Sequence, residues 1–203
     1  MAPRNTADDA AIIHWPAQQP LIQSIDYFRS FVSDPFLFGR IATLHSLNDV
    51  YAMGAQPQHA LALASIPFAS EALMRDDLLQ VMSGCLYELA SANTQLMGGH
   101  SNESAEFSFG LAVNGTSDNG QLLNKAIPPG EFDLILSKPL GTATLFAGAM
   151  RGVAKGRWIQ QAITTMLQSN AKASTIFKQC AVACTDVTGF GLLGHLKEML
   201  GQG

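Results

Sequence analysis

The sequence has little charge, little cysteine and no long apolar run. Charged residues make up 14% of the chain and the formal net charge is −4, with no basic block, so nucleic-acid binding through phosphate neutralisation is not expected. No segment approaches the roughly 20 apolar residues that cross a bilayer, and no basic-then-apolar signal segment opens the chain, so we expect no membrane association. The three cysteines make no disulfide framework, which predicts a reducing, cytoplasmic location.

The chain nevertheless has enough apolar residues for a substantial core. Of its 203 residues 47% are hydrophobic, and the mean hydropathy is +0.14, enough for one large domain or two small ones. Segments with strand and helix patterns alternate in the first part, which predicts an α/β layer. We expect strands at 10–14, 21–28, 59–66 and 107–115, and helices at 35–53 and 70–92.

A turn-forming Ile-Pro-Pro-Gly segment at 127–130 is the strongest boundary signal. It divides a first domain, residues 1–128, from a second, residues 129–203. For the second domain we expect strands at 132–137 and 181–184, and helices at 142–153, 157–169, 171–179 and 191–200. Two strands with no partner sheet bury apolar helix faces poorly, so we expect the sequence to be part of a longer one.

One acid stands out in the predicted helix 35–53. Asp34 is a good N-cap, and Gly54 is a natural stop for a helix whose apolar residues recur every three or four positions. Asp49 lies off that apolar stripe and near the end of the helix, where the dipole disfavours negative charge by up to ~1 kcal/mol. The pattern leaves two interpretations of Asp49 open, a solvated surface acid and a cation ligand.

Other acids lie at similar places, at strand ends or beside helix ends. They are Asp8, Asp9, Asp26, Asp49 and Asp186. Oxygen ligands suit Mg²⁺. The segment 98–101, Gly-Gly-His-Ser, follows a predicted strand and is either a plain turn or a loop that presents N–H groups to a phosphate. Together these features favour a nucleoside triphosphate bound through Mg²⁺.

A Gly-x-Gly-x-x-Gly pattern at 189–194 admits two interpretations. Between a strand and a helix it outlines a dinucleotide fingerprint, although the acid expected about 20 residues further on falls beyond Gly203. The alternative is a tight turn with close packing. Cysteines and histidines do not have zinc-ligand spacing, and we interpret Cys180 and Cys184 as small apolar residues.

Six motifs in order resemble those of the selenophosphate synthetase (selenide, water dikinase) family. They lie at 8–11 (Asp-Asp-Ala-Ala), 34–42, 48–54 (Asn-Asp-Val-Tyr-Ala-Met-Gly), 98–101, 138–141 (Lys-Pro-Leu-Gly) and 185–195 (Thr-Asp-Val-Thr-Gly-Phe-Gly-Leu-Leu-Gly-His). The resemblance implies the two-domain α/β (α+β) architecture of the aminoimidazole ribonucleotide synthetase-like superfamily. It also implies ATP-dependent phosphorylation of selenide to selenophosphate, with release of AMP and phosphate.

The resemblance further implies roles for individual residues. Residues matching Asp9, Asp49 and Asp186 hold Mg²⁺ in the family. The ATP site is lined by residues matching Thr6, Ala7, Asp8, Asp26 and Asp49. The segment matching Gly99, His100 and Ser101 reaches the ATP of the neighbouring protomer, which implies a homodimer.

The family's reactive Cys or selenocysteine and its nearby Lys would lie ahead of Met1, so no catalytic residue is expected within this chain. Ala7 also stands where some members have a basic residue. We therefore expect a fragment that is inactive alone. A nucleotide-binding module or pseudoenzyme without selenide chemistry is the alternative.

Overall fold

The computed structural model describes residue 15, residues 19–117 and residues 120–201. The predicted strand at 10–14 lies outside these residues. Contacts divide the chain into two units, Met1–Val50 with Ala55–Gln121, and Tyr51–Gly54 with Leu122–Gly203. Each unit is described by itself. The domain boundary at 128 stays a prediction.

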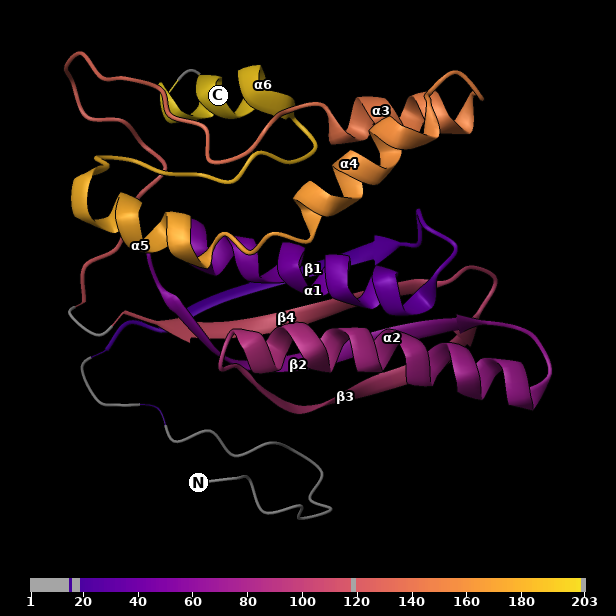
Figure 1. Ribbon diagram of the computed structural model, residues 1–203. Coiled ribbons are helices and arrows are strands. Elements are labelled where there is room, and N and C mark those ends of the chain that lie inside the picture. Colours follow the sequence, from indigo (N-terminus) through magenta and orange to yellow (C-terminus); the bar gives the residue numbers. More distant parts are fainter. Residues whose placement is uncertain (1–14, 16–18, 118–119, 202–203) are drawn as a thin grey trace. The chain divides into compact units, whose positions relative to one another are not determined.

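The first unit is a mixed four-stranded sheet with two helices (Figure 1). Its strands are β1 (Ile22–Arg29), β2 (Gln56–Pro67), β3 (Gln95–Ser104) and β4 (Ser108–Thr116), and its helices are α1 (Pro35–Ala52) and α2 (Glu71–Ser91). The strand order is β1-β4-β2-β3. The pairs β1–β4 and β4–β2 are antiparallel, whereas β2 and β3 are parallel and are joined through α2. This confirms the predicted α/β fold.

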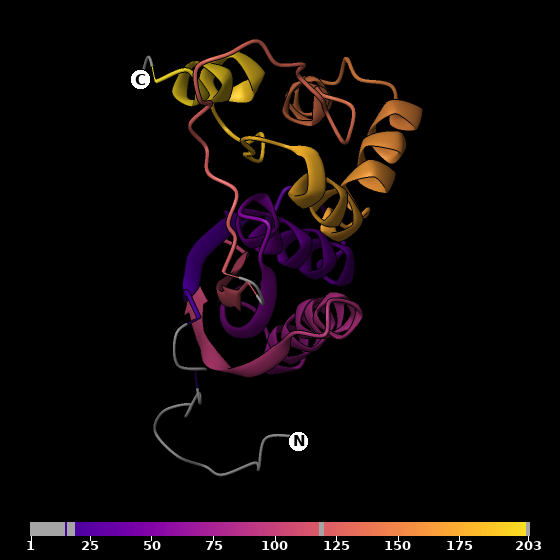
Figure 2. The ribbon, with the colours of Figure 1, turned by 90° about the vertical axis from the view of Figure 1, so that its left-hand side faces the viewer.

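Both helices cover the same face of the sheet (Figure 2). The strands alternate accordingly: in β2, Ala60, Ala62 and Ala64 are buried, whereas Leu61 and Leu63 are exposed on the opposite face. The strand predicted at 59–66 is therefore present and is buried on one face only. Small alanines allow the helices to approach the sheet closely, since they leave little side-chain volume between the layers.

The ends of α1 are where the sequence predicts them. The Asp34 carboxylate accepts a hydrogen bond from the Leu37 N–H (3.0 Å), and Gly54 has φ of +67°, a left-handed conformation that suits glycine. The apolar stripe is confirmed, because Ile41, Leu44 and Leu47 are all buried.

Two glycines fix how closely α1 approaches α2. A Cβ atom on Gly39 would lie against the Val81 carbonyl oxygen, and one on Gly84 against the Phe36 carbonyl oxygen, both well inside the 3.0 Å that real Cβ atoms keep. Next to this crossing, Arg40 Nε donates to the buried Glu88 carboxylate (2.6 Å). The backbones therefore touch directly, and a buried charge pair lies beside the contact.

Two details of α2 and β3 correct the sequence predictions. Ser70 takes the N-cap position of α2, but its side chain makes no capping hydrogen bond. Residues 98–101 are not a loop. They belong to β3 and pair in parallel with β2, with a register shift at Ala60/Leu61. A turn or loop was predicted because a glycine pair normally indicates one, whereas Gly99 is needed here for a close approach to the backbone of Ala62.

The second unit is helical, with α3 (Thr142–Met150), α4 (Gly156–Met166), α5 (Ala171–Cys180) and α6 (Gly191–Met199), all of them predicted. The strands predicted at 132–137 and 181–184 were wrong, because no strand forms among the described residues 120–201. A strand requires a hydrogen-bonding neighbour, and these two do not pair with each other. Phe132, Leu134 and Ile135 are consequently exposed.

We expect Gly84→Ala to lower the free energy of unfolding by about 1–3 kcal/mol, the usual cost of overpacking. The added methyl meets the backbone of α1, and a backbone carbonyl cannot rotate away as a side chain can. Urea denaturation followed by circular dichroism measures the loss. Gly156→Ala adds the same methyl where nothing lies within 4 Å and is the matched control. Equal stability of the Gly84 variant and the parent would contradict the close approach.

Candidate functional site: acidic residues between β1 and α1

Two contacts align β1 with the outer side of α1. The Ser24 hydroxyl donates a hydrogen bond to the Asp49 carboxylate, and the Phe28 ring packs edge-on against the His45 ring with centroids 4.6 Å apart. Ser24 and Phe28 are four residues apart on a strand, and His45 and Asp49 are four apart on a helix. Both pairs therefore lie on single faces of their elements, and the strand runs opposite to the helix.

Asp26 occupies the middle of this arrangement. It shares the strand face of Ser24 and Phe28, because side chains alternate along a strand. It is therefore placed between the two contacts, beside the turn of α1 that carries Asp49. Asp26 and Asp49 are both half-buried. This acidic site between β1 and α1 thus gathers two carboxylates and a hydroxyl, an oxygen-only donor set of the kind that Mg²⁺ prefers.

The structure brings together only part of the predicted site. Asp26 and Asp49 belong to the acidic site, whereas Thr6, Ala7, Asp8 and Asp9 lie outside the described residues. In the described part of the chain, no group of three or more His, Cys, Asp or Glu residues gathers to hold a metal ion. The acidic site therefore supplies two acids of a larger predicted set.

Gly99, His100 and Ser101 are exposed on β3, which is an edge strand of the sheet. An edge strand has hydrogen-bonding groups without a neighbour in the sheet, so this segment is accessible to another molecule.

Ser24 and His45 were not among the predicted ATP- or metal-binding residues. A signal for Ser24 was present in its spacing of two from Asp26, which places both side chains on one strand face. His45 has the corresponding helical spacing of four from Asp49. The sequence could not indicate that these two faces oppose each other.

Asp186 lies in the second unit, in a segment without regular structure before α6. It is half-buried, and its charge contributes, after burial, to raising the pKa of the neighbouring Cys184 thiol. The Gly-x-Gly-x-x-Gly pattern at 189–194 leads into α6, but no strand lies directly before it, since the described residues 120–201 contain none. The dinucleotide fingerprint therefore lacks the strand on which it depends.

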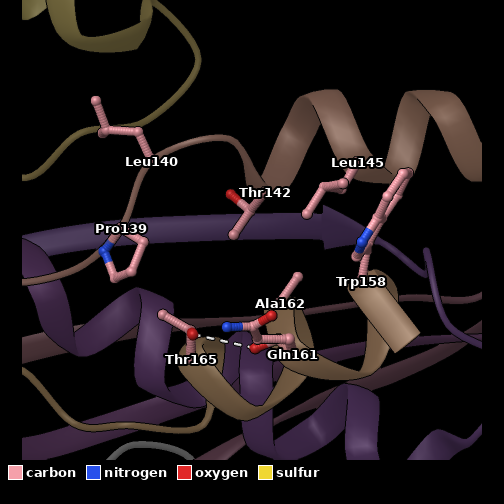
Figure 3. Close-up of a pocket in the computed structure, with 8 residues that line it drawn as sticks. All are labelled: Pro139, Leu140, Thr142, Leu145, Trp158, Gln161, Ala162 and Thr165. Atoms are coloured by element: carbon pink, nitrogen blue, oxygen red, sulfur yellow. Dashed lines mark hydrogen bonds between the residues drawn. The ribbon is translucent and has the colours of Figure 1, made fainter. Parts of the chain in front are cut away.

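A pocket of about 470 Å³ opens between α3 and α4 in the second unit (Figure 3). Trp158, Leu145 and Leu140 line it together with the polar but uncharged Thr142, Gln161 and Thr165. None of its lining residues carries a charge, so it offers no counter-charge to a polyphosphate. The acidic site of the first unit remains the better candidate.

The face of the sheet that the helices leave uncovered is apolar. Ile25 is 70% exposed, and Tyr27, Leu61 and Leu63 are also exposed there. The Tyr27 hydroxyl reaches across β4 to Ser65 Oγ (2.5 Å). An apolar patch of this kind marks an interaction surface on many soluble proteins.

Residues 7–117 match the family model described as AIR synthase related protein, N-terminal domain. The chain belongs to this family. A curated selenide, water dikinase from Carboxydothermus hydrogenoformans is 39% identical over 198 residues, which cover 97% of this chain and 57% of that protein. One from Geobacter metallireducens is 40% identical over 96% of this chain and 56% of that protein. The chain thus spans little more than half the length of these relatives.

Solved structures of other proteins share the fold. Thiamine-monophosphate kinase from Stenotrophomonas maltophilia superposes with a TM-score of 0.80 at 23% identity, covering 96% of this chain and 65% of that one. The hydrogenase maturation protein HypE in complex with ATP superposes with a TM-score of 0.72 at 18% identity, covering 97% of this chain and 59% of that one.

Within the described residues, no helix is long and apolar enough to cross a membrane. The cytoplasmic location stays a prediction.

The cysteines of this family member differ in reactivity. Burial raises the pKa of the Cys85 thiol to about 11, whereas Cys180 is exposed. Since the thiolate is the reacting form, we expect iodoacetamide at neutral pH to label Cys180 in the folded chain and Cys85 only after unfolding. Peptide mass spectrometry with and without urea measures this. Labelling of Cys85 as fast as Cys180 in the folded chain would contradict its assignment to the core.

Proposed function

We propose that this chain is the ATP- and Mg²⁺-binding part of a selenophosphate synthetase, which phosphorylates selenide with ATP and releases AMP and phosphate. The observation that carries the proposal is the identity of 36–40% to curated selenide, water dikinases over nearly the whole chain. A fold shared with HypE, which was solved with ATP, supports nucleotide binding. Because the chain spans 57% of the first of these relatives, the activity belongs to the longer protein.

We assign the Mg²⁺ ligands to Asp9, Asp49 and Asp186, and the ATP contacts to Thr6, Ala7, Asp8, Asp26 and Asp49. Mg²⁺, when bound, neutralises and orients the polyphosphate. The Ser24 hydroxyl fixes the Asp49 carboxylate by a hydrogen bond, so this oxygen ligand is oriented before a cation binds. The residues that handle selenide, a Cys or selenocysteine and a Lys in the family, are proposed to lie outside the 203 residues.

We further propose that the protein is a homodimer. The uncovered sheet face presents Ile25, Tyr27, Leu61 and Leu63, whose burial against a second copy would remove apolar surface from water. The neighbouring edge strand β3 exposes Gly99, His100 and Ser101. In a dimer built on this face, that segment is available to the ATP site of the partner.

We expect Asp49→Asn to weaken Mg²⁺-dependent ATP binding at least about tenfold, or about 1.4 kcal/mol, and to abolish selenophosphate formation. The reason is the loss of one carboxylate charge from the acidic site, while an amide oxygen still accepts the Ser24 hydrogen bond, so the fold is kept. Calorimetry and ³¹P NMR on a protein extended to the full span of the relatives measure both effects.

Asp76→Asn is the control, because Asp76 is exposed on α2. Its binding and activity should equal those of the parent. Full activity of the Asp49 variant would refute the assignment. An extended protein that binds ATP but forms no selenophosphate would favour the nucleotide-binding module instead.

For the dimer, we expect Leu61→Glu to shift the protein from dimer to monomer in sedimentation velocity, since a buried unpaired carboxylate opposes association. Leu86→Glu is the matched control, because Leu86 is 48% exposed on α2, whereas Leu61 is 42% exposed on the open sheet face. A parent that is monomeric at all concentrations would contradict the homodimer.

A further inference from the structure

A buried histidine in α6 holds the segment that carries Asp186. His195 is 5% exposed, and its Nε2 accepts a hydrogen bond from the Thr188 backbone N–H (3.1 Å). A backbone N–H can only donate, so Nε2 carries no hydrogen in this arrangement. On the other side of the ring, Nδ1 lies 3.2 Å from the Glu198 carboxylate and 3.3 Å from Lys125 Nζ, and the Thr188 hydroxyl lies 3.1 Å from Nε2 beside the backbone N–H.

Glu198 is itself fixed. Lys125 pairs with its carboxylate, and this hydrogen bond is the main cause that lowers the pKa of Glu198 below its ordinary value. The ring of His195 is thus oriented from one side by Glu198 and Lys125, and it presents Nε2 to Thr188 on the other side. An oriented acceptor of this kind sets the position of the donor, much as outer hydrogen bonds orient metal-ligating side chains.

The Asp186 segment is also tied at its other end. The Cys184 N–H donates to the Asn124 carbonyl oxygen (3.0 Å). Between this anchor and the Thr188 anchor lie only three residues, 185–187, with Asp186 in the middle. Both hydrogen bonds depend on residues 124–125. Asn124 accepts the Cys184 N–H, and Lys125 pairs with Glu198, which in turn contacts the His195 ring.

We propose that His195 is a positioning residue that fixes the Asp186 carboxylate for cation binding by accepting the Thr188 N–H. The inference rests on the proposed role of Asp186 as a Mg²⁺ ligand. His195 does not touch the cation in this scheme. Its contribution is to restrict the motion of residues 185–187, which belong to no helix or strand.

The hydrogen bond can be tested first in the unmodified 203-residue chain. We expect a ¹⁵N–¹⁵N coupling across the hydrogen bond between the Thr188 amide and His195 Nε2, and slow exchange of that amide. Absence of both would overturn the inference without any substitution, and it would leave the proposed function untouched.

Two substitutions then separate the two sides of the ring. His195→Gln places an amide oxygen close to the position of Nε2 and keeps an acceptor for Thr188. His195→Asn keeps a group near Nδ1 for Glu198 but withdraws the acceptor. We expect the Asn variant to exchange the Thr188 amide at least about tenfold faster and to bind Mn²⁺, added with ATP, several-fold more weakly, whereas the Gln variant stays near the parent. Electron paramagnetic resonance of free Mn²⁺ measures the affinity.

Asp186→Asn distinguishes failure of the inference from failure of the proposed function. If this variant loses Mn²⁺ affinity while His195→Asn binds as the parent does, the positioning role is overturned and the ligand role of Asp186 survives. If Asp186→Asn itself binds Mn²⁺ as tightly as the parent, the proposed ligand role fails and the positioning role fails with it. Loss of affinity in both variants, with rescue by glutamine, supports the inference.

Discussion

The direct contact of the α1 and α2 backbones at Gly39 and Gly84 is the constraint on which the first unit depends. Two helices with larger side chains at these positions could not lie so close together on one face of a four-stranded sheet. The contact fixes the placement of α1 over the sheet, and the buried pair of Arg40 and Glu88 adds a directional hydrogen bond beside it. The position of α1 in turn decides what its outer side meets.

The outer side of α1 contacts β1. The Ser24–Asp49 hydrogen bond and the Phe28–His45 ring contact fix the register of helix against strand, and Asp26 lies between them on the same strand face. The facing sides of β1 and α1 thus carry carboxylate and hydroxyl oxygens, the donors that Mg²⁺ prefers.

In the second unit, hydrogen bonds rather than helix packing fix the position of the predicted ligand Asp186. The Asp186 segment has no regular secondary structure, so its position depends on side-chain and backbone hydrogen bonds at Cys184 and Thr188. Buried polar networks of this type are costly when one partner is missing, because the others remain desolvated. A histidine with both ring nitrogens engaged is therefore a strong determinant of local geometry, although the glycine pattern by itself suggested either a dinucleotide fingerprint or a tight turn.

The sequence by itself determined the elements whose causes are local. The cap at Asp34, the left-handed stop at Gly54 and the apolar period of α1 and α2 were readable, because each depends on residues within a few positions of each other. The order of helices and strands predicted the α/β layer, and the motifs indicated the family. The strands predicted at 132–137 and 181–184 failed because a strand is stabilised by a neighbour that its own residues do not specify. Only the tertiary structure decided that β1 faces α1, that Ser24 orients Asp49, and that His195 holds Thr188, since each joins residues whose spacing along the chain carries no information about their distance in space.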